Sequence, residues 1–235
     1  MSTEGQHRSD IEGLRQRAHL ATTLLHEAYG SPRHDNKDDP LDELIFIILS
    51  QMTTRQSYGR VYDRLKGTYT SWEAILELSL DELKEAIKDA GLINQKAPRI
   101  KAILATLKED FGSVTLDPLH EVSDEGAERY LTSLPGVGLK TAKCVLALSS
   151  LQRPVLPVDT HVWRVGRRLE LVGEDVSYTR VHGALEDVVP PEDRYAFHVN
   201  NLTHGKLTCI ALRPRCHRCI LNELCPYPRR STEHT

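Results

Sequence analysis

Signals for the start and end of helices recur along this chain at short intervals, and they restrict its fold more than any other feature. Apolar residues follow helical spacing in several segments, such as 11–29 and 41–50. No segment alternates apolar and polar residues over the length of a strand. The sequence therefore predicts an all-α fold of roughly ten short helices. Helix starts are indicated by Asp39-Pro40, by the capping-box patterns Thr70-x-x-Glu73 and Ser79-x-x-Glu82, and by Ser123.

The composition is that of a globular protein, but the charge is unevenly distributed. Of 235 residues, 40% are hydrophobic and 27% are charged. The longest apolar run, 44–49, is too short to cross a bilayer, so we expect a cytoplasmic protein with no membrane partner. The net charge is −3, yet residues 1–134 carry 16 basic and 23 acidic residues while the remainder carries 14 and 10. Basic segments 161–168 and 204–218 predict either phosphate binding or an ordinary solvated helix face.

The segment 134–142 reads LPGVGLKTA and contains the first chemical motif. Gly136 and Gly138 permit a tight turn, and the N–H groups of the next helix start, including that of Thr141, are suited to an anion such as DNA phosphate. Val137 is expected to anchor the turn in the core. The pattern resembles the helix-hairpin-helix motif of DNA-binding proteins. A plain connector between two helices is the alternative.

The second motif is Pro157-Val-Asp159-Thr-His161. Asp159 precedes a helical stretch, so it is typical of an N-cap. A carboxylate at a helix N-terminus stays ionised, and an ionised carboxylate near a sugar carbon stabilises the positive charge that develops when a glycosidic bond breaks. The two roles are compatible, and the motif alone does not choose between them.

Four of the five cysteines lie within 17 residues near the C-terminus. In a chain expected inside the cell, this density of cysteines favours a metal site over disulfide bonds. Zinc sites usually pair two Cys-x-x-Cys knuckles, whereas this loop has one, which favours a [4Fe–4S] cluster over zinc. The predicted ligands are Cys209, Cys216, Cys219 and Cys225.

In this order and spacing, the three motifs resemble the endonuclease III family of DNA glycosylases, over roughly residues 39–226. The resemblance implies two helical domains flanking a DNA-binding cleft. One is a six-helix barrel with the helix-hairpin-helix, residues 43–153. The other is an iron–sulfur cluster domain, residues 10–42 and 154–235. It also implies a monomeric bacterial protein, associated with the nucleoid, that binds duplex DNA carrying an oxidised base or an abasic site.

The same resemblance implies a bifunctional glycosylase and AP lyase that removes oxidised pyrimidines such as thymine glycol. Lys140 falls on the family's catalytic lysine, which forms a Schiff base with the sugar, and Asp159 on its catalytic aspartate. An ordinary phosphate-binding lysine is the alternative for Lys140. The implied DNA-binding residues are Gln51, Leu92, Gly136, Gly138, Thr141 and His161.

The sequence departs from the family pattern in the segment Leu49-Ser-Gln-Met-Thr-Thr54, where relatives commonly read Leu-Ser-x-Gln-x-Thr. Either Gln51 or Met52 fills the space left by a flipped base, and Leu92 is either a wedge between bases or a core leucine. This departure, with Thr132 where a carboxylate is frequent, motivates an alternative: a weakly active or non-catalytic iron–sulfur protein that binds damaged DNA. A mismatch-specific glycosylase of the same superfamily is a further alternative, which Lys140 disfavours.

Overall fold

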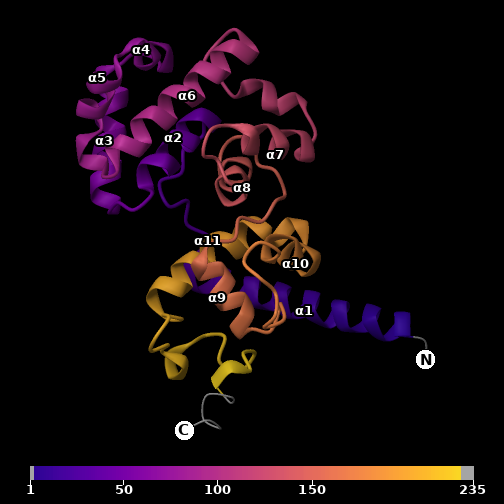
Figure 1. Ribbon diagram of the computed structural model, residues 1–235. Helices are drawn as coiled ribbons and strands as arrows, with labels where there is room; N and C mark the ends of the chain where they lie inside the picture. The colour runs from indigo at the N-terminus through magenta and orange to yellow at the C-terminus, as the bar shows by residue number, and fades with distance from the viewer. Residues whose placement is uncertain (1–2, 229–235) are drawn as a thin grey trace. The chain divides into compact units, whose positions relative to one another are not determined.

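A computed structural model describes residues 3–228 of the chain, with side chains described from Asp10 onward. Two compact units share these residues: 35–153 form one, and 1–34 with 154–235 form the other. The all-α prediction is confirmed, since helices are the only regular secondary structure between residues 3 and 228 (Figure 1). Residues 229–235, which end the predicted cluster domain, lie outside the described residues. None of the described helices combines the length and apolarity that a bilayer crossing requires.

The unit 35–153 is built around α2 (Pro40–Ser50), which is buried at every position except Asp42 and Ser50. The predicted start is confirmed, because the Asp39 side chain accepts a hydrogen bond from Asp42 N and Pro40 occupies the first turn. Helices α3, α6 and α8 pack against α2. The remaining elements of this unit are α3 (Arg55–Thr68), α4 (Trp72–Glu77), α5 (Leu80–Ala86), η1 (Lys88–Ala90), α6 (Ile93–Phe111), η2 (Asp117–Glu121), α7 (Asp124–Ser133) and α8 (Leu139–Leu148).

One of the two predicted capping boxes is confirmed and the other is wrong. Ser79 caps α5 and exchanges hydrogen bonds with Glu82, as predicted. Thr70 does not cap α4, because Ser71 is the cap. Glu73, the other half of the predicted box, accepts a hydrogen bond from Val114 N at 3.0 Å instead. The Glu73 carboxylate therefore connects α4 to a segment distant in sequence. The capping-box pattern considers only residues near the start of the helix, so it does not predict this contact.

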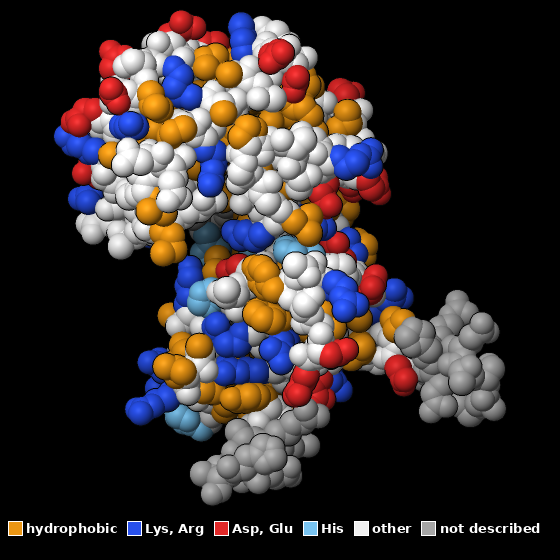
Figure 2. All heavy atoms as spheres, in the orientation of Figure 1, with side chains coloured by type: hydrophobic (Ala, Val, Ile, Leu, Met, Phe, Trp, Pro, Cys, Tyr) orange, Lys and Arg blue, Asp and Glu red, His pale blue; other side chains and the backbone are white. Residues whose placement is uncertain are grey.

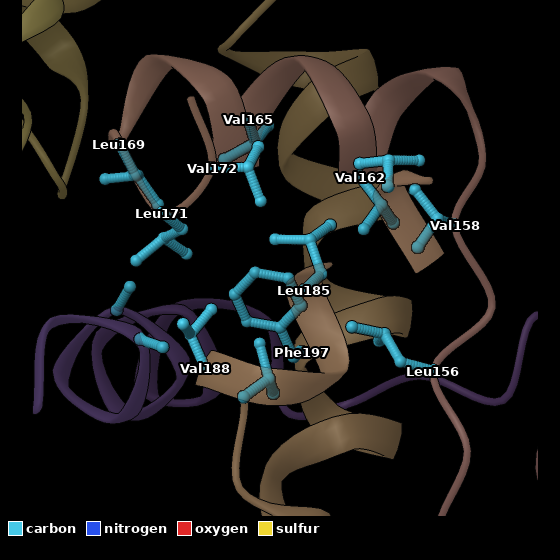
Figure 3. Packing of buried hydrophobic residues seen from close by; sticks show 14 of the residues in the cluster. Leu156, Val158, Val162, Val165, Leu169, Leu171, Val172, Leu185, Val188 and Phe197 are labelled. Carbon is cyan, nitrogen blue, oxygen red and sulfur yellow. The ribbon is translucent and has the colours of Figure 1, made fainter. Parts of the chain in front are cut away.

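The unit 1–34 with 154–235 has its own apolar core, formed where α1, α9, α10 and α11 pack together. Figure 3 shows side chains of α9, among them Val162 and Val165, pointing toward Leu185 of α10 and Phe197 of α11. The first helix begins eight residues earlier than its apolar spacing predicts, at Thr3 rather than Ile11. The elements of this unit are α1 (Thr3–Tyr29), α9 (Thr160–Arg168), α10 (Val181–Val188), η3 (Pro191–Asp193), α11 (Arg194–Leu207) and η4 (Cys216–Arg218).

Candidate functional site

The predicted hairpin joins α7 to α8 in the unit 35–153. Leu134 and Val137 are buried, so the turn is anchored in the core as predicted. Gly136 has a φ of 71°, a left-handed conformation that disfavours any residue with a Cβ. Gly138 precedes α8, and no side chain caps this helix. The helix start is thus available to an anion from outside the protein.

Lys140 lies in the first turn of α8 and is half-buried. Thr141 follows it with only 7% of its surface exposed, so it can reach DNA through its backbone N–H but hardly through its side chain. Lys143 is also buried, and its Nζ pairs with Glu128 Oε2 of α7 at 3.1 Å. This ion pair ties the two helices of the hairpin together, one turn after Lys140.

A buried carboxylate that was not predicted from the sequence interacts electrostatically with Lys140. Glu43, on α2, is completely buried and accepts hydrogen bonds from Asn36 Nδ2 at 2.6 Å and Lys37 N at 2.7 Å. Burial raises the pKa of Glu43, and the positive charges of Lys140 and Lys37 act in the opposite direction. The sequence gives no clear signal for this burial, because Glu43 follows Asp42 in the first turn of the helix, directly before the apolar run 44–49, where acidic residues are common.

The two loops that the resemblance assigns to DNA lie in the same unit. Met52 follows the end of α2 with 87% of its surface exposed, and Leu92 precedes α6 with 46% exposed. Gln51 is half-buried, and its Oε1 accepts a hydrogen bond from Arg99 at 2.8 Å. The Arg99 guanidinium also lies against Gly136, where a Cβ would come 2.8 Å from Arg99 Cζ. Arg99 therefore links Gln51 to the hairpin.

Asp159 is the N-cap of α9, as its position before that helix predicts. One oxygen, Oδ1, accepts hydrogen bonds from His161 N and Val162 N, both at 2.8 Å. The side chain is half-buried. Because a single oxygen makes both capping bonds, the carboxylate is held in one orientation while capping leaves Oδ2 for another task.

His161 is held by its neighbours as a neutral imidazole. Burial, together with the charge of Arg164, lowers the pKa of His161, although Asp159 acts in the opposite direction. Arg164 Nη2 lies 3.0 Å from His161 Nδ1, and the ring also forms a hydrogen bond with the backbone of Gly205. His161 thus lies at the start of α9 as a neutral imidazole.

The four predicted cysteine ligands border one cavity in the unit 1–34 with 154–235. All four are free thiols. Burial raises the pKa of Cys216, Cys219 and Cys225, to about 11 for Cys225, and the neighbouring cysteines act in the same direction. Such thiols bind a metal group only by losing their protons, which the positive charge of that group makes favourable. Among the described residues, no group of three or more His, Cys, Asp or Glu side chains is placed to hold a metal ion.

The helix that Asp159 begins also holds the start of the cysteine loop. Arg164 donates to Cys209 O and to Gly205 O, both at 2.8 Å. Arg168, four residues later, donates to Cys209 Sγ at 3.1 Å and to Ala211 O at 2.8 Å. Helix α9 therefore positions Asp159, His161 and the start of the cysteine loop within this unit. Figure 2 shows Lys and Arg side chains gathered on the face of this unit that the view presents.

The hairpin and the capped Asp159 lie in a segment of the chain that matches a known family. A family model described as HhH-GPD superfamily base excision DNA repair protein matches residues 45–191, which include the hairpin and Asp159. The chain belongs to this superfamily. The match ends before the cysteine loop at 209–225.

Within the HhH-GPD superfamily, the predicted resemblance to endonuclease III is confirmed. Endonuclease III of Haemophilus influenzae is 37% identical over 191 residues, which are 81% of this chain and 85% of the relative. Endonuclease III of Escherichia coli K12 is 36% identical over 193 residues, 82% and 86% of the two chains. A solved non-covalent endonuclease III–DNA complex matches with a TM-score of 0.75 at 27% identity, covering 99% of this chain and 100% of that one. A trapped covalent endonuclease III–DNA intermediate gives 0.73 at 28% identity, with the same coverage.

Proposed function

We propose that this HhH-GPD protein is a bifunctional DNA glycosylase and AP lyase that removes oxidised pyrimidines, of the thymine glycol type, from duplex DNA. The observation that carries the proposal is the position of Lys140, a half-buried amine in the first turn of a helix that no side chain caps. The uncapped turn favours phosphate, and the proposed reaction uses the Lys140 amine in its neutral form, in which it can act as a nucleophile. The similarity to endonuclease III supports this reading of both features.

Lys140 and Asp159 have separate tasks in the proposed reaction. The neutral Nζ of Lys140 attacks C1′ of the flipped nucleotide, so a C1′–N bond forms while the glycosidic bond breaks and its electron pair leaves with the base, which takes up a proton. The Asp159 carboxylate stabilises the positive charge on the sugar during this step. The C1′–O4′ bond then breaks as O4′ takes up a proton released by the attacking amine, which opens the ring and gives the Schiff base. Loss of a C2′ proton next expels the 3′ phosphate, which leaves with the electron pair of the C3′–O bond.

Cys209, Cys216, Cys219 and Cys225 are proposed to hold a [4Fe–4S] cluster. The support is the chemistry of the donor set, because four free thiols that border one cavity match a group with four thiolate ligands, although their positions do not form a site for a single metal ion. When bound, the cluster supplies a rigid cross-link of residues 209–225. The protein's own contribution is Arg168, which donates a hydrogen bond to Cys209 Sγ and thereby stabilises a thiolate there.

The proposed DNA contacts lie in both units. In the unit 35–153 they are the N–H groups that follow Gly136 and Gly138, together with the loops at 51–52 and 92. In the other unit His161 contacts DNA at the start of α9, and the exposed Arg213, Arg215 and Arg218 add charge near the cysteines. We further propose that the two units are the helical barrel and cluster domains predicted above. The protein acts as a monomer in the bacterial cytoplasm, in association with the nucleoid.

Borohydride trapping tests the proposal directly. Purified protein and Lys140→Gln are mixed with duplexes that contain thymine glycol, uracil or an abasic site, and borohydride reduces any Schiff base to a stable cross-link. We expect a cross-link to the thymine glycol duplex that Lys140→Gln abolishes while retaining DNA binding. Trapping at the abasic site alone would contradict the glycosylase half of the proposal. No trapping with intact binding would instead indicate a non-catalytic protein that binds damaged DNA.

A further inference from the structure

His204 is a buried histidine that the proposed chemistry does not use. It lies in the last turn of α11, borders the cysteine cavity and has 1% of its surface exposed. The basic segment 204–218 begins at this residue, yet a side chain buried to this degree cannot face phosphate. The partners of the His204 ring lie inside the protein.

Both ring nitrogens of His204 lie close to polar atoms from distant segments. Nε2 is 3.5 Å from Sγ of Cys219, one of the four proposed cluster ligands. Nδ1 is 3.0 Å from the hydroxyl of Tyr29, the last residue of α1, and the Tyr29 ring packs against the imidazole. The same hydroxyl lies 3.4 Å from Thr208 Oγ1. A chain of polar contacts thus runs from the end of α1 through His204 to Cys219.

The backbone of His204 holds a second cysteine of the loop. Its carbonyl oxygen accepts hydrogen bonds from Thr208 N and Cys209 N, both at 2.8 Å, and so fixes the start of the loop at the end of α11. His204 therefore contacts Cys209 through its backbone and Cys219 through its side chain. A substitution of the side chain leaves the carbonyl in place, so the contact with Cys219 can be tested by itself.

The direction of the side-chain hydrogen bonds follows from what a metal-bound sulfur can do. A cysteine that binds a metal group has lost its proton, so its sulfur can only accept. His204 Nε2 must then carry a hydrogen and donate it to Cys219 Sγ. Burial favours a neutral imidazole, in which Nδ1 is the acceptor, and the Tyr29 hydroxyl is placed to donate to it. Tyr29 thereby fixes the tautomer that Cys219 requires.

We propose that His204 is a positioning residue of the cysteine site, which donates a hydrogen bond to the Cys219 thiolate and is held in the required tautomer by Tyr29. The inference rests on the proposed cluster and is independent of the proposed glycosylase chemistry. An N–H donor stabilises negative charge on the sulfur, and hydrogen bonds to the sulfurs are among the factors that set the potential of an iron–sulfur cluster. His204 is therefore expected to raise the reduction potential of the cluster and to slow the loss of iron.

The two side-chain donors to the cysteines come from different helices and differ in charge. Arg168 of α9 brings a positive charge to Cys209 Sγ, at 3.1 Å. His204 of α11 brings a neutral N–H to Cys219 from a fully buried position. Water cannot easily replace a donor at so buried a position, so removal of the imidazole leaves the Cys219 sulfur without that hydrogen bond.

The experiment compares His204→Leu with His204→Gln in purified, iron-loaded protein. Leucine removes the donor, whereas the amide of glutamine can place an N–H near the position of Nε2. For His204→Leu we expect iron–sulfur stretching bands at higher frequency in the resonance Raman spectrum, a more negative reduction potential, and iron loss to a chelator that is faster by roughly tenfold. His204→Gln should resemble the wild type in all three measurements.

His198→Leu is the matched control for a purely structural effect. His198 lies on the same helix, is buried to a similar degree, and its Nδ1 contacts Pro157 O at 2.8 Å. This variant loses a buried imidazole as well, but we expect the bands and the potential of the wild type. Tyr29→Phe keeps the aromatic ring and removes only the hydroxyl, so it should shift the bands and the potential in the direction of His204→Leu, by a smaller amount.

Unchanged bands and potential in His204→Leu would overturn the proposal, as would equal shifts in His198→Leu or a His204→Gln that behaves like His204→Leu. If His204→Leu does not fold with iron, Tyr29→Phe decides, because wild-type bands and potential in that variant would contradict the chain of contacts. The proposed cluster fails separately, through a wild-type protein that contains no iron and sulfide. None of these measurements depends on glycosylase activity.

Discussion

At the scale of the single residue, Asp159 caps a helix and is also proposed to have a chemical role. Its Oδ1 accepts two backbone N–H bonds at the start of α9, which fixes the carboxylate in place. The proposed chemistry needs the negative charge of that carboxylate, while the cap needs only a well-placed oxygen. The two roles can therefore be separated by substitution.

Asp159→Asn is expected to retain the stability of the protein and lose most of its glycosylase activity. Asparagine caps helices about as well as aspartate but carries no charge to stabilise the sugar cation. We expect a loss of roughly a hundredfold or more in single-turnover base release. Asp159→Ala should lose the same activity and about 1 kcal/mol of stability as well. Urea unfolding and a single-turnover assay measure the two effects, and an active Asp159→Asn would contradict the assigned role.

Lys96 makes the stability of the protein depend on pH in a defined range. Burial lowers the pKa of Lys96 from 10.5 to about 8, and the charge of Arg99 adds to the effect. Below pH 8 the Lys96 amine is charged in both the folded and the unfolded state, so its contribution to the free energy of unfolding does not change with pH. Between pH 8 and about 10.5 the unfolded chain binds a proton that the folded protein lacks, so the contribution of Lys96 to the free energy of unfolding rises with pH.

Lys96→Met removes this titration. The difference in unfolding free energy between wild type and Lys96→Met should therefore shift in favour of the wild type as pH rises from 8 to 10. Urea unfolding at intervals of one pH unit provides the measurement, with Lys101→Met as the matched control, because Lys101 also lies on α6 and donates to the carbonyls of Leu76 and Leu78. A difference that stays constant over this range would mean that the ammonium is not buried in solution.

At the scale of the element, α9 has nine residues and connects the two functional features of its unit. It begins at the Asp159 cap and ends with Arg168, whose guanidinium donates to Cys209 Sγ and to the carbonyls of Ile210 and Ala211. The planar fork of arginine can satisfy several acceptors at once, which the ammonium of lysine cannot match in the same geometry.

Arg168→Lys is accordingly expected to loosen the start of the cysteine loop without unfolding the unit. Faster hydrogen exchange of residues 209–211 should follow in the purified protein, as should faster loss of iron from the proposed cluster to a chelator. Arg167→Lys is the matched control, because Arg167 is exposed and packs over the Trp163 ring instead of the loop. Equal exchange and equal iron loss in the two variants would show that the fork does not hold the loop.

At the scale of the whole molecule, the charge is divided along the chain in a way that bears on DNA binding. The acidic excess lies in residues 1–134, and the basic excess lies in the remainder. Exposed arginines near the cysteines, at positions 213, 215 and 218, belong to the basic part. Since the net charge is −3, binding to a polyanion must depend on where these charges are placed.

Replacing these three arginines with glutamine should weaken DNA binding and reduce its dependence on salt. Each lost phosphate contact lowers the slope of log K against log salt by about 0.9, so the triple variant should lose about 2 to 3 units of slope. Replacing Lys66, Lys84 and Lys88, which are ion-paired on the surface of the unit 35–153, provides a control with the same change in net charge. Fluorescence anisotropy at several salt concentrations measures the DNA affinity and its salt dependence for the two triple variants. An unchanged slope in the arginine variant would exclude these contacts.

The features predicted correctly from sequence are those whose interactions are local. Asp39, Ser79 and Asp159 each cap a helix by binding an N–H two or three residues ahead, so the neighbouring sequence contains the whole interaction. The prediction at Thr70 was wrong because Ser71, one residue later, starts the helix, while Glu73 binds Val114 N, 41 residues away. Glu43 was missed for the same reason: its burial comes from packing by other helices.

The sequence by itself determined the all-α class, the buried hairpin turn and the family. Each of these depends on residues close together in the chain: the periodicity of apolar residues, the position of the glycines, and the order of the reactive side chains. The tertiary structure alone decided how the two loops proposed to contact DNA, at 51–53 and 90–92, are held. Lys96 finds acceptors 47 and 43 residues away, and Arg99 reaches Gln51 across 48 residues. Burial and hydrogen-bond partners depend on which distant segments pack together, and that arrangement exists only once the core has formed.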